Sequence, residues 1–504
     1  MTNSKRFIIN VVSTAIRVCG IAMLPASLVG LYHNETKSSL ILFTISVITI
    51  TIGRLVARFF ANPAEPPVTR ARYAAILITW LVLVFIGMLP FYGAGNDYSL
   101  IDSLVESCAG FCTTSLSIIP FASMPVCLQL WRCLCSWIGG LLCVMLTMSL
   151  SPSLLVTGRK LFSAEIPSLS MLKESATYRG VYFKLMTVYS SVTLAGFILL
   201  MIFGMGKFDA FTTALCSVST SGLPMFSIAR SAGFNWGIKI VIMLMNLLGS
   251  LNVALIYIAA LRGFKRACQN NELNFFLRIL LVSAAVISLS QIWAQISGSG
   301  MNSLGTSMAQ RTESILKIIA DSVMVSVSFS STSGFITTDY LHWTPLTVTV
   351  LLIISIIGAC AVSTGGGIKV SRLVAVSKSI RLGIYQHIHP NAIKPVKVNG
   401  KPLDSAVVIR YSMYMVLFLI FTLFGALLLS LDTLSIEQCF DLSTSMMTTN
   451  GTVLSNLGNG TQLFQSLMPF SKVVIVILMI AGRIEIYPVL MILFKSFWIT
   501  KSND

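Results

Sequence analysis

The sequence predicts an all-α protein that crosses a membrane many times, built from four related units behind an extra pair of amino-terminal helices. Hydrophobic residues make up 55% of the chain and charged residues only 11%, and the mean hydropathy is +0.84. An ordinary soluble domain has about 25% charged residues. The second observation that carries this prediction is a polar loop that recurs four times along the chain.

The four copies of this loop share residue types and spacing. Their aligned residues are Ser115, Gly222, Gly334 and Gly451. Successive copies lie 107, 112 and 117 residues apart, which is too long for a solenoid repeat and indicates a larger module. A polar residue also stands 13 positions before each aligned residue, namely Asp102, Asp209, Asp321 and Gln438. The shared offset argues against four unrelated loops.

Each module is predicted to contain a short helix that ends near the middle of the membrane. Asp is a good N-cap, so Asp102 is expected to begin a helix that ends at about Phe111. Such a helix is about 15 Å long, roughly half of a bilayer core, and its carboxy-terminal end carries partial negative charge. Non-helical backbone at that depth must be buried in protein or line a water-filled cavity.

Four such loops around one axis predict a ring of carbonyl oxygens that can replace the water shell of a cation. Glycine suits the aligned position because it adopts positive φ freely and carries no side chain. The residues expected to line the ring are Thr113, Thr114, Ser115, Thr220, Ser221, Gly222, Thr332, Ser333, Gly334, Thr449, Asn450 and Gly451.

Apolar stretches and basic loops divide the chain into five segments. These are an amino-terminal helix pair (1–69) and four units (70–180, 181–270, 271–400 and 401–504). The expected spans cover about 15–32, 40–60, 73–92, 137–155, 188–203, 238–261, 276–293, 346–360, 411–429 and 473–497. Basic residues cluster between spans, with the longest basic loop at 369–401, so the positive-inside rule places these loops and both termini in the cytoplasm. The net charge of +17 therefore reflects topology rather than nucleic-acid binding.

Two further motifs interrupt the apolar spans. Three adjacent glycines, Gly365, Gly366 and Gly367, are expected to break a helix. They mark either a simple helix end or a flexible segment that lies under the ring and opens and closes the path of the cation. Arg483 lies within an apolar stretch, where a charge is costly and usually functional or paired. Glu485 is two positions away and does not face it on a helix, so Arg483 is expected to face the pathway or another helix.

The sequence contains no motif that would indicate an enzymatic or a metal-binding site. The sequence contains no pair of CxxC motifs and no HExxH or GxSxG motif, and its four histidines fall in predicted loops. We therefore expect no catalytic residues, no transition-metal site and no cofactor in this chain.

Four features of the sequence together carry a resemblance to a known family: the four polar loops, Trp137-Ile138-Gly139-Gly140, the glycine segment ending at Lys369, and residues 482–487 (Gly-Arg-Ile-Glu-Ile-Tyr). In these features the chain resembles the Trk/Ktr/HKT superfamily of potassium and sodium transporters. The bacterial TrkH-type membrane subunit is the most similar type. The resemblance implies four M1–pore helix–M2 repeats with pseudo-fourfold symmetry in a multi-pass protein of the cell inner membrane. It also implies a homodimer with one pore per subunit and a cytosolic nucleotide-binding RCK-type (TrkA-like) partner.

The resemblance further implies that Gly222, Gly334 and Gly451 are filter glycines, that Gly365 to Gly367 form an intramembrane gating loop, and that Arg483 projects into the pathway. Ser115 departs from the glycine expected in the first unit. Plant relatives with serine there look sodium-selective, so sodium stays open beside potassium as the transported ion. The alternatives are a sodium-preferring HKT-like transporter and a secondary ion-coupled transporter, whose inverted repeats do not match four copies of one orientation.

Overall fold

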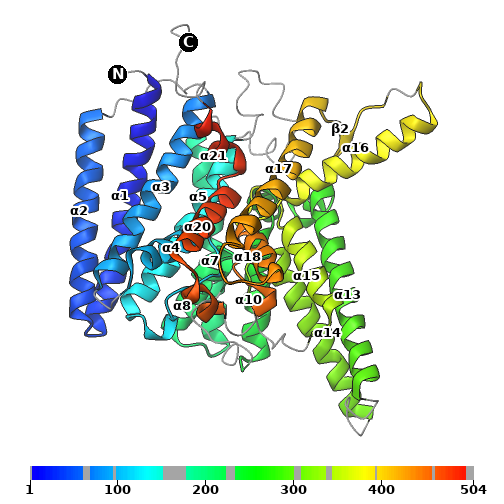
Figure 1. Ribbon diagram of the computed structural model, residues 1–504, viewed down its shortest axis with the longest axis horizontal. Helices are drawn as coiled ribbons and strands as arrows, with labels where there is room; N and C mark the ends of the chain where they lie inside the picture. Colours follow the sequence, from blue (N-terminus) through cyan, green and yellow to red (C-terminus); the bar gives the residue numbers. More distant parts are fainter. Residues whose placement is uncertain are drawn as a thin grey trace.

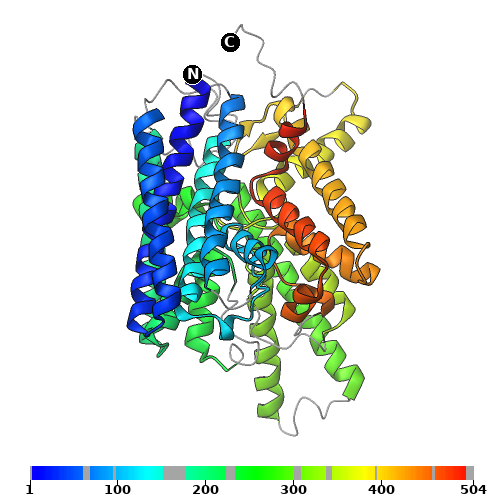
Figure 2. The same ribbon diagram turned by 60° about the vertical axis from the view of Figure 1, so that its left-hand side comes forward.

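The computed structural model describes residues 3–60, 69–94, 98–150, 178–222, 233–299, 308–335, 343–391, 394–456 and 460–494. Within these ranges the chain forms a bundle of helices, confirming the all-α prediction (Figure 1). Helices α1 (Asn3–Tyr32) and α2 (Thr36–Phe60) pair along one side of the bundle (Figures 1 and 2). Gly20 allows their close approach, and Ser46 Oγ donates to its carbonyl oxygen at 2.7 Å.

Four units follow, and each contains a long helix, an inner helix that leads into a polar loop, and a further helix or pair of helices. The first unit comprises α3 (Thr69–Gly93), α4 (Leu100–Phe111) and α5 (Val126–Leu150). The second comprises α7 (Tyr178–Ile202), α8 (Lys207–Val218), α10 (Trp236–Ser250) and α11 (Val253–Arg262). The third comprises α13 (Asn271–Ser299), α14 (Met308–Ser330), α15 (Pro345–Ile357) and α16 (Val370–Ile388). The fourth comprises α17 (Ser405–Leu429), α18 (Ile436–Thr448), α20 (Pro469–Arg483) and α21 (Ile486–Leu493).

Short elements connect these helices. They are η1 (Phe121–Ser123), α12 (Phe264–Ala267), β1 (Lys397–Val398), β2 (Lys401–Pro402), η5 (Leu454–Asn456) and α19 (Gly460–Ser466). Strands β1 and β2 form one antiparallel pair. Among the described residues, seven helices are long and apolar enough to cross a membrane, or eight if the bent pair α10 and α11 counts as one span. The start of α1 and the end of α21 lie at the same end of the bundle (Figure 1).

Two spans expected to be continuous are broken. Helices α10 and α11 meet at 107°, and Asn252 caps α11 by accepting the N–H of Ala254 at 3.0 Å. Helix α20 ends at Arg483, and Glu485, with φ +67°, precedes α21. Hydropathy alone does not reveal the first break, which contains no charged residue, whereas the second break falls at the charged residues Arg483 and Glu485.

The expected basic loop 369–401 is also wrong for its first half. Residues 370–388 form α16, which projects sideways from the bundle (Figure 1). The stretch contains no proline, and one helix face carries the buried Val370, Val374 and Ala375, which is the spacing of an amphipathic helix.

The expected N-caps of the inner helices require a correction as well. Ser99 caps α4, and its Oγ accepts the N–H of Asp102 at 3.0 Å, so Asp102 lies inside the first turn. Ser435 and Gln438 form the corresponding capping box of α18. Asp321 lies well inside α14, because that helix begins at Met308 and, together with α13, extends beyond the rest of the bundle (Figure 1).

Helix α5 begins at Val126, earlier than the span expected from residue 137. The carboxylate of Glu35, in the turn between α1 and α2, accepts the N–H groups of Val126 at 2.7 Å and Cys127 at 3.0 Å. A carboxylate at this position satisfies free backbone donors and complements the helix dipole. The polar residues of the first α5 turns are thus part of the helix.

Candidate functional site

The four polar loops leave their inner helices in the same way. In the first unit, the N–H of Thr113 donates to Gly110 O at 2.9 Å and the N–H of Thr114 donates to Ala109 O at 2.8 Å. The same pair of bonds follows α8, α14 and α18, and it is the pattern of a Schellman helix end. The threonines that make the first bond are Thr113, Thr220, Thr332 and Thr449, with φ between 52° and 57°.

The aligned position two residues later separates the first unit from the others. Gly222, Gly334 and Gly451 have φ of 71°, 61° and 80°, whereas Ser115 lies outside the positive-φ region. A side chain at positive φ costs about 1 kcal/mol or more. The serine loop therefore takes a different backbone conformation at this point.

The loops contact one another in a closed cycle. The N–H of Ser115 donates to Asn450 O at 3.3 Å, which joins the first loop to the fourth. Thr452 Oγ1 donates to Gly334 O at 3.2 Å, which joins the fourth loop to the third. A Cβ added at Gly222 would lie 2.4 Å from Ser115 Oγ of the first loop and 2.4 Å from Ser333 O of the third, so the second loop packs closely against both. Consecutive units are thus neighbours, and the fourth closes on the first.

Several buried oxygens at this ring have no hydrogen-bond partner among the described residues. They are Thr113 Oγ1, Thr114 Oγ1, Thr449 Oγ1 and Asn450 Oδ1. Buried polar oxygens are normally paired, and neutral oxygens are the ligands that a monovalent cation uses in place of water. The expected ring residues are thus brought together around the helix ends of all four units.

Residues 358–369, which we call the crossing segment, lie directly against three of these loops and are entirely buried. Thr364 Oγ1 donates to Val218 O at 3.0 Å and Gly249 O at 2.9 Å, in the second unit. The N–H of Gly366 donates to Thr332 Oγ1 in the third loop at 2.7 Å. A Cβ added at Gly366 would lie 2.2 Å from Thr448 O of the fourth unit, so there is no room for a side chain there.

On the side away from the loops, the crossing segment is held by the break between α10 and α11 and by the start of α13. Val253 N–H donates to Val362 O at 3.1 Å, so the break between α10 and α11 pairs with the segment. Glu272, in the first turn of α13, accepts the N–H of Ala361 at 2.6 Å. The glycine run is therefore a packed, hydrogen-bonded structure rather than a plain helix end.

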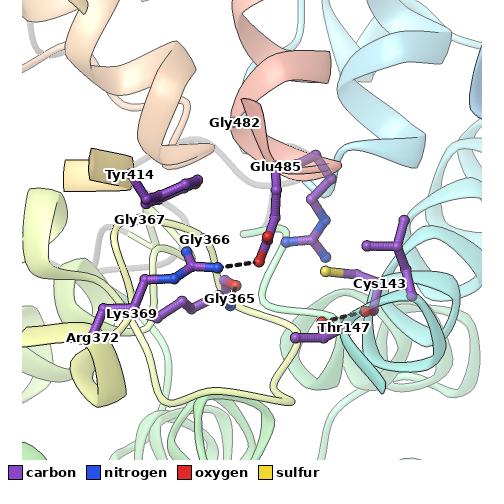
Figure 3. Close-up of a pocket in the computed structure, with 12 residues that line it drawn as sticks. Cys143, Thr147, Gly365, Gly366, Gly367, Lys369, Arg372, Tyr414, Gly482 and Glu485 are labelled. Carbon is purple, nitrogen blue, oxygen red and sulfur yellow. Dashed lines mark hydrogen bonds and ion pairs between the residues drawn. The ribbon is translucent and has the colours of Figure 1, made fainter. Parts of the chain in front are cut away.

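Arg483 is 3% exposed and reaches the same segment. Its Nη1 donates to Thr364 O at 2.6 Å, whereas Nε and Nη2 have no hydrogen-bond partner among the described residues. It does not pair with Glu485, as the helix geometry predicted. Glu485 instead binds Arg372 of α16, whose guanidinium lies 3.9 Å from the ring centre of Tyr414 (Figure 3).

Sequence reasoning missed three charged residues near the ring and the crossing segment. Glu106 and Arg132 form a buried ion pair behind the first loop, with Nε and Oε1 2.8 Å apart. Glu272 holds the crossing segment. Each is a charge next to apolar sequence, which is the available signal for a functional or paired residue in a membrane protein.

The comparisons with known proteins agree with this architecture. The family model "TrkH: Cation transport protein" matches residues 39–498. The chain is 28% identical to the Trk system potassium uptake protein TrkG of Escherichia coli (strain K12), over 99% of each chain. It is 26% identical to the Trk system potassium uptake protein TrkH of Vibrio parahaemolyticus, over 98% of this chain and 99% of that protein.

The fold matches a solved structure over its whole length. The crystal structure of the potassium transporter TrkH from Vibrio parahaemolyticus has a TM-score of 0.82 and 21% sequence identity, covering 98% of this chain and 99% of that one. With the family match over most of the sequence, these likenesses identify a multi-pass membrane transport protein and not an enzyme. The chain belongs to the TrkH family of cation transport proteins.

Proposed function

We propose that this protein takes up monovalent cations, with potassium as the main ion, through a selectivity filter formed by the four loops. The closed cycle of contacts among the loops supports this proposal, because it brings all four loops together and places buried oxygens of the first, third and fourth units at their contacts. The names of the relatives, which are potassium uptake proteins, support potassium as the ion.

The crossing segment, with Gly365, Gly366 and Gly367, is the gate in this proposal. It lies against the loops of three units, and its hydrogen bonds to Thr332 and Val218 hold it across the axis. Arg483 supports the closed position through Thr364. Backbone without side chains at Gly366 allows this close approach, and its displacement would clear the space under the filter.

We also propose that this chain forms a homodimer and binds a cytosolic, nucleotide-binding RCK-type (TrkA-like) subunit. The projecting helix α16 can link that subunit to the gate. Arg372 of α16 binds Glu485 at the break in the fourth unit, and α16 itself starts where the crossing segment ends. The basic residues between the spans support a cytoplasmic position for both termini, and the family match supports the cell inner membrane.

Uptake of radioactive rubidium into proteoliposomes, competed by unlabelled potassium or sodium, tests this function. We expect uptake that potassium suppresses. Growth on low potassium of bacteria that lack their own uptake systems gives a second readout, with the gating subunit supplied by the host. Failure in both assays by protein that is correctly inserted would contradict the proposal, and uptake that depends on a counter-ion gradient would favour the ion-coupled alternative.

Substituting Ser115 by glycine is expected to move the preference toward potassium. The serine hydroxyl lies beside Gly222, and the first loop lacks the positive φ of the other three, so glycine gives it access to the same backbone. We expect the potassium-to-sodium flux ratio to rise by about tenfold, or about 1.4 kcal/mol. Equal exclusion of sodium by wild type and variant, at matched protein levels, would show that Ser115 does not set selectivity and would remove the sodium-preferring alternative.

A further inference from the structure

The first loop is held from behind by a buried ion pair, and among the described residues no such pair lies behind the other loops; the fourth loop has a lone buried carboxylate, Asp441, which accepts the N–H of Ser455 at 2.7 Å. Glu106 of α4 and Arg132 of α5 have side chains that are 0% and 1% exposed, with Arg132 Nε 2.8 Å from Glu106 Oε1. A buried charge is costly unless it is paired and its remaining hydrogen-bonding groups are satisfied. Both conditions are met here, and all but one of the groups that satisfy them belong to the loop.

Arg132 binds the backbone on both sides of Ser115. Its Nη2 donates to Thr114 O at 3.0 Å and to Leu116 O at 3.1 Å. Its Nη1 donates to Ser136 Oγ at 2.7 Å, one turn along α5, which fixes the plane of the guanidinium. The two carbonyls that flank the aligned residue of the first loop are therefore directed by one rigid side chain.

Glu106 holds the backbone that follows. Its carboxylate accepts Ser117 Oγ at 3.0 Å and the N–H groups of Ile118 at 3.0 Å and Ile119 at 3.3 Å. Together, Arg132 and Glu106 bind five of the six residues from 114 to 119, all except Ser115 itself. We call this pair, with its bonds to the loop, the first-loop clamp.

The clamp coincides with the one non-glycine filter position. The residue nine positions before the aligned one is Glu106 in the first unit, and its counterparts are Thr213, Val325 and Leu442. Those three units have glycine at positive φ at the aligned position, and the first has serine outside that region. A backbone that cannot use the glycine conformation must be given its shape by other contacts, and the clamp supplies them.

We propose that Arg132 and Glu106 are positioning residues that set the ion preference of the ring, by fixing the orientation of the peptide groups on both sides of Ser115. The inference rests on the proposed cation pathway. A ring of carbonyls discriminates between ions through the number and position of its oxygens. One unit held in a distinct geometry changes that arrangement for the whole ring.

Arg132→Lys separates geometry from charge. Lysine keeps the positive charge opposite Glu106, but a single ammonium cannot reproduce the planar fork that reaches Glu106, Ser136 and both carbonyls. We expect Arg132→Lys to assemble normally and to move the rubidium-to-sodium and potassium-to-sodium flux ratios toward one by about tenfold, which is about 1.4 kcal/mol. A role limited to folding would lower the flux of all three ions by the same factor.

The matched control lies on the same helix. Asp102, in the first turn of α4, pairs with Lys472 at 2.8 Å, and the structure gives it no bond to the loop backbone. Asp102→Asn removes a carboxylate from an α4 ion pair, as Glu106→Gln does. We expect unchanged flux ratios for Asp102→Asn and altered ratios for Glu106→Gln, with all fluxes measured in proteoliposomes at equal protein content.

The double variant Glu106→Gln, Arg132→Met guards against a folding defect, because removing both charges avoids an unpaired buried ion. Its monodisperse protein is expected to show the same loss of discrimination. Wild-type ratios in Arg132→Lys and in the double variant would overturn the clamp while leaving the proposed pathway intact. Absence of any cation flux in the wild-type protein would instead overturn the pathway and the inference with it.

Discussion

Alanine at position 334 is expected to reduce potassium flux by at least about a hundredfold while the protein still inserts. Gly334 has φ +61°. A Cβ added there would lie 2.5 Å from Thr452 Oγ1 and 2.6 Å from Asn450 O, closer than atoms of a folded protein approach without a bond. The third or fourth loop must therefore move, and the hydrogen bond from Thr452 Oγ1 to Gly334 O is lost with it. Because a tenfold change corresponds to about 1.4 kcal/mol, moderate distortion of the ring is sufficient.

Gly204→Ala is the matched control for this substitution. Gly204 also has positive φ, +92°, but no atom lies within 4 Å of the Cβ that alanine would add. It therefore carries the same kind of backbone strain away from any contact. Rubidium uptake of the two variants should be compared at equal protein content. Normal flux and ion ratios in Gly334→Ala would remove Gly334 from the filter.

The arrangement of the four loops could be predicted from the sequence because each unit repeats the same local pattern. Glycine at the aligned position signals positive φ in three units. The left-handed threonines two positions earlier, such as Thr113 and Thr449, could not be predicted in this way. Threonine disfavours that conformation, and its adoption depends on the Schellman bonds of the completed helix end.

The features that sequence reasoning missed depend on residues far apart in the chain. The break before α11 is joined to Val362, more than 100 residues later, and Glu485 at the other break binds Arg372. Arg132 and Glu106 lie on different helices, so no local pattern links them. A single sequence shows each charge as an isolated exception in an apolar stretch, and only the packed structure shows its partner.

Alanine at position 483 is expected to raise cation flux by about tenfold or more. In the proposed pathway, Arg483 would act in two ways. Its Nη1 holds Thr364 O at 2.6 Å, which helps to keep the crossing segment in place. Its buried positive charge also opposes a passing cation, and two unit charges about 4 Å apart repel by about 4 kcal/mol at an effective dielectric constant of 20. Loss of a third of that barrier is enough for a tenfold rise.

Two further variants separate the hydrogen bond from the charge. Arg483→Gln removes the charge and keeps an amide donor toward Thr364, whereas Arg483→Lys keeps the charge on a flexible stem without the planar fork. If electrostatic repulsion dominates, glutamine should raise rubidium flux as alanine does and lysine should leave it low. If the bond to Thr364 dominates, glutamine should leave it low, and lysine, whose ammonium can still donate to Thr364 O, should leave it low in either case. Unchanged flux in all three folded variants would contradict both roles, and a failure of all three to assemble, against normal assembly of Gly204→Ala, would make Arg483 a structural residue.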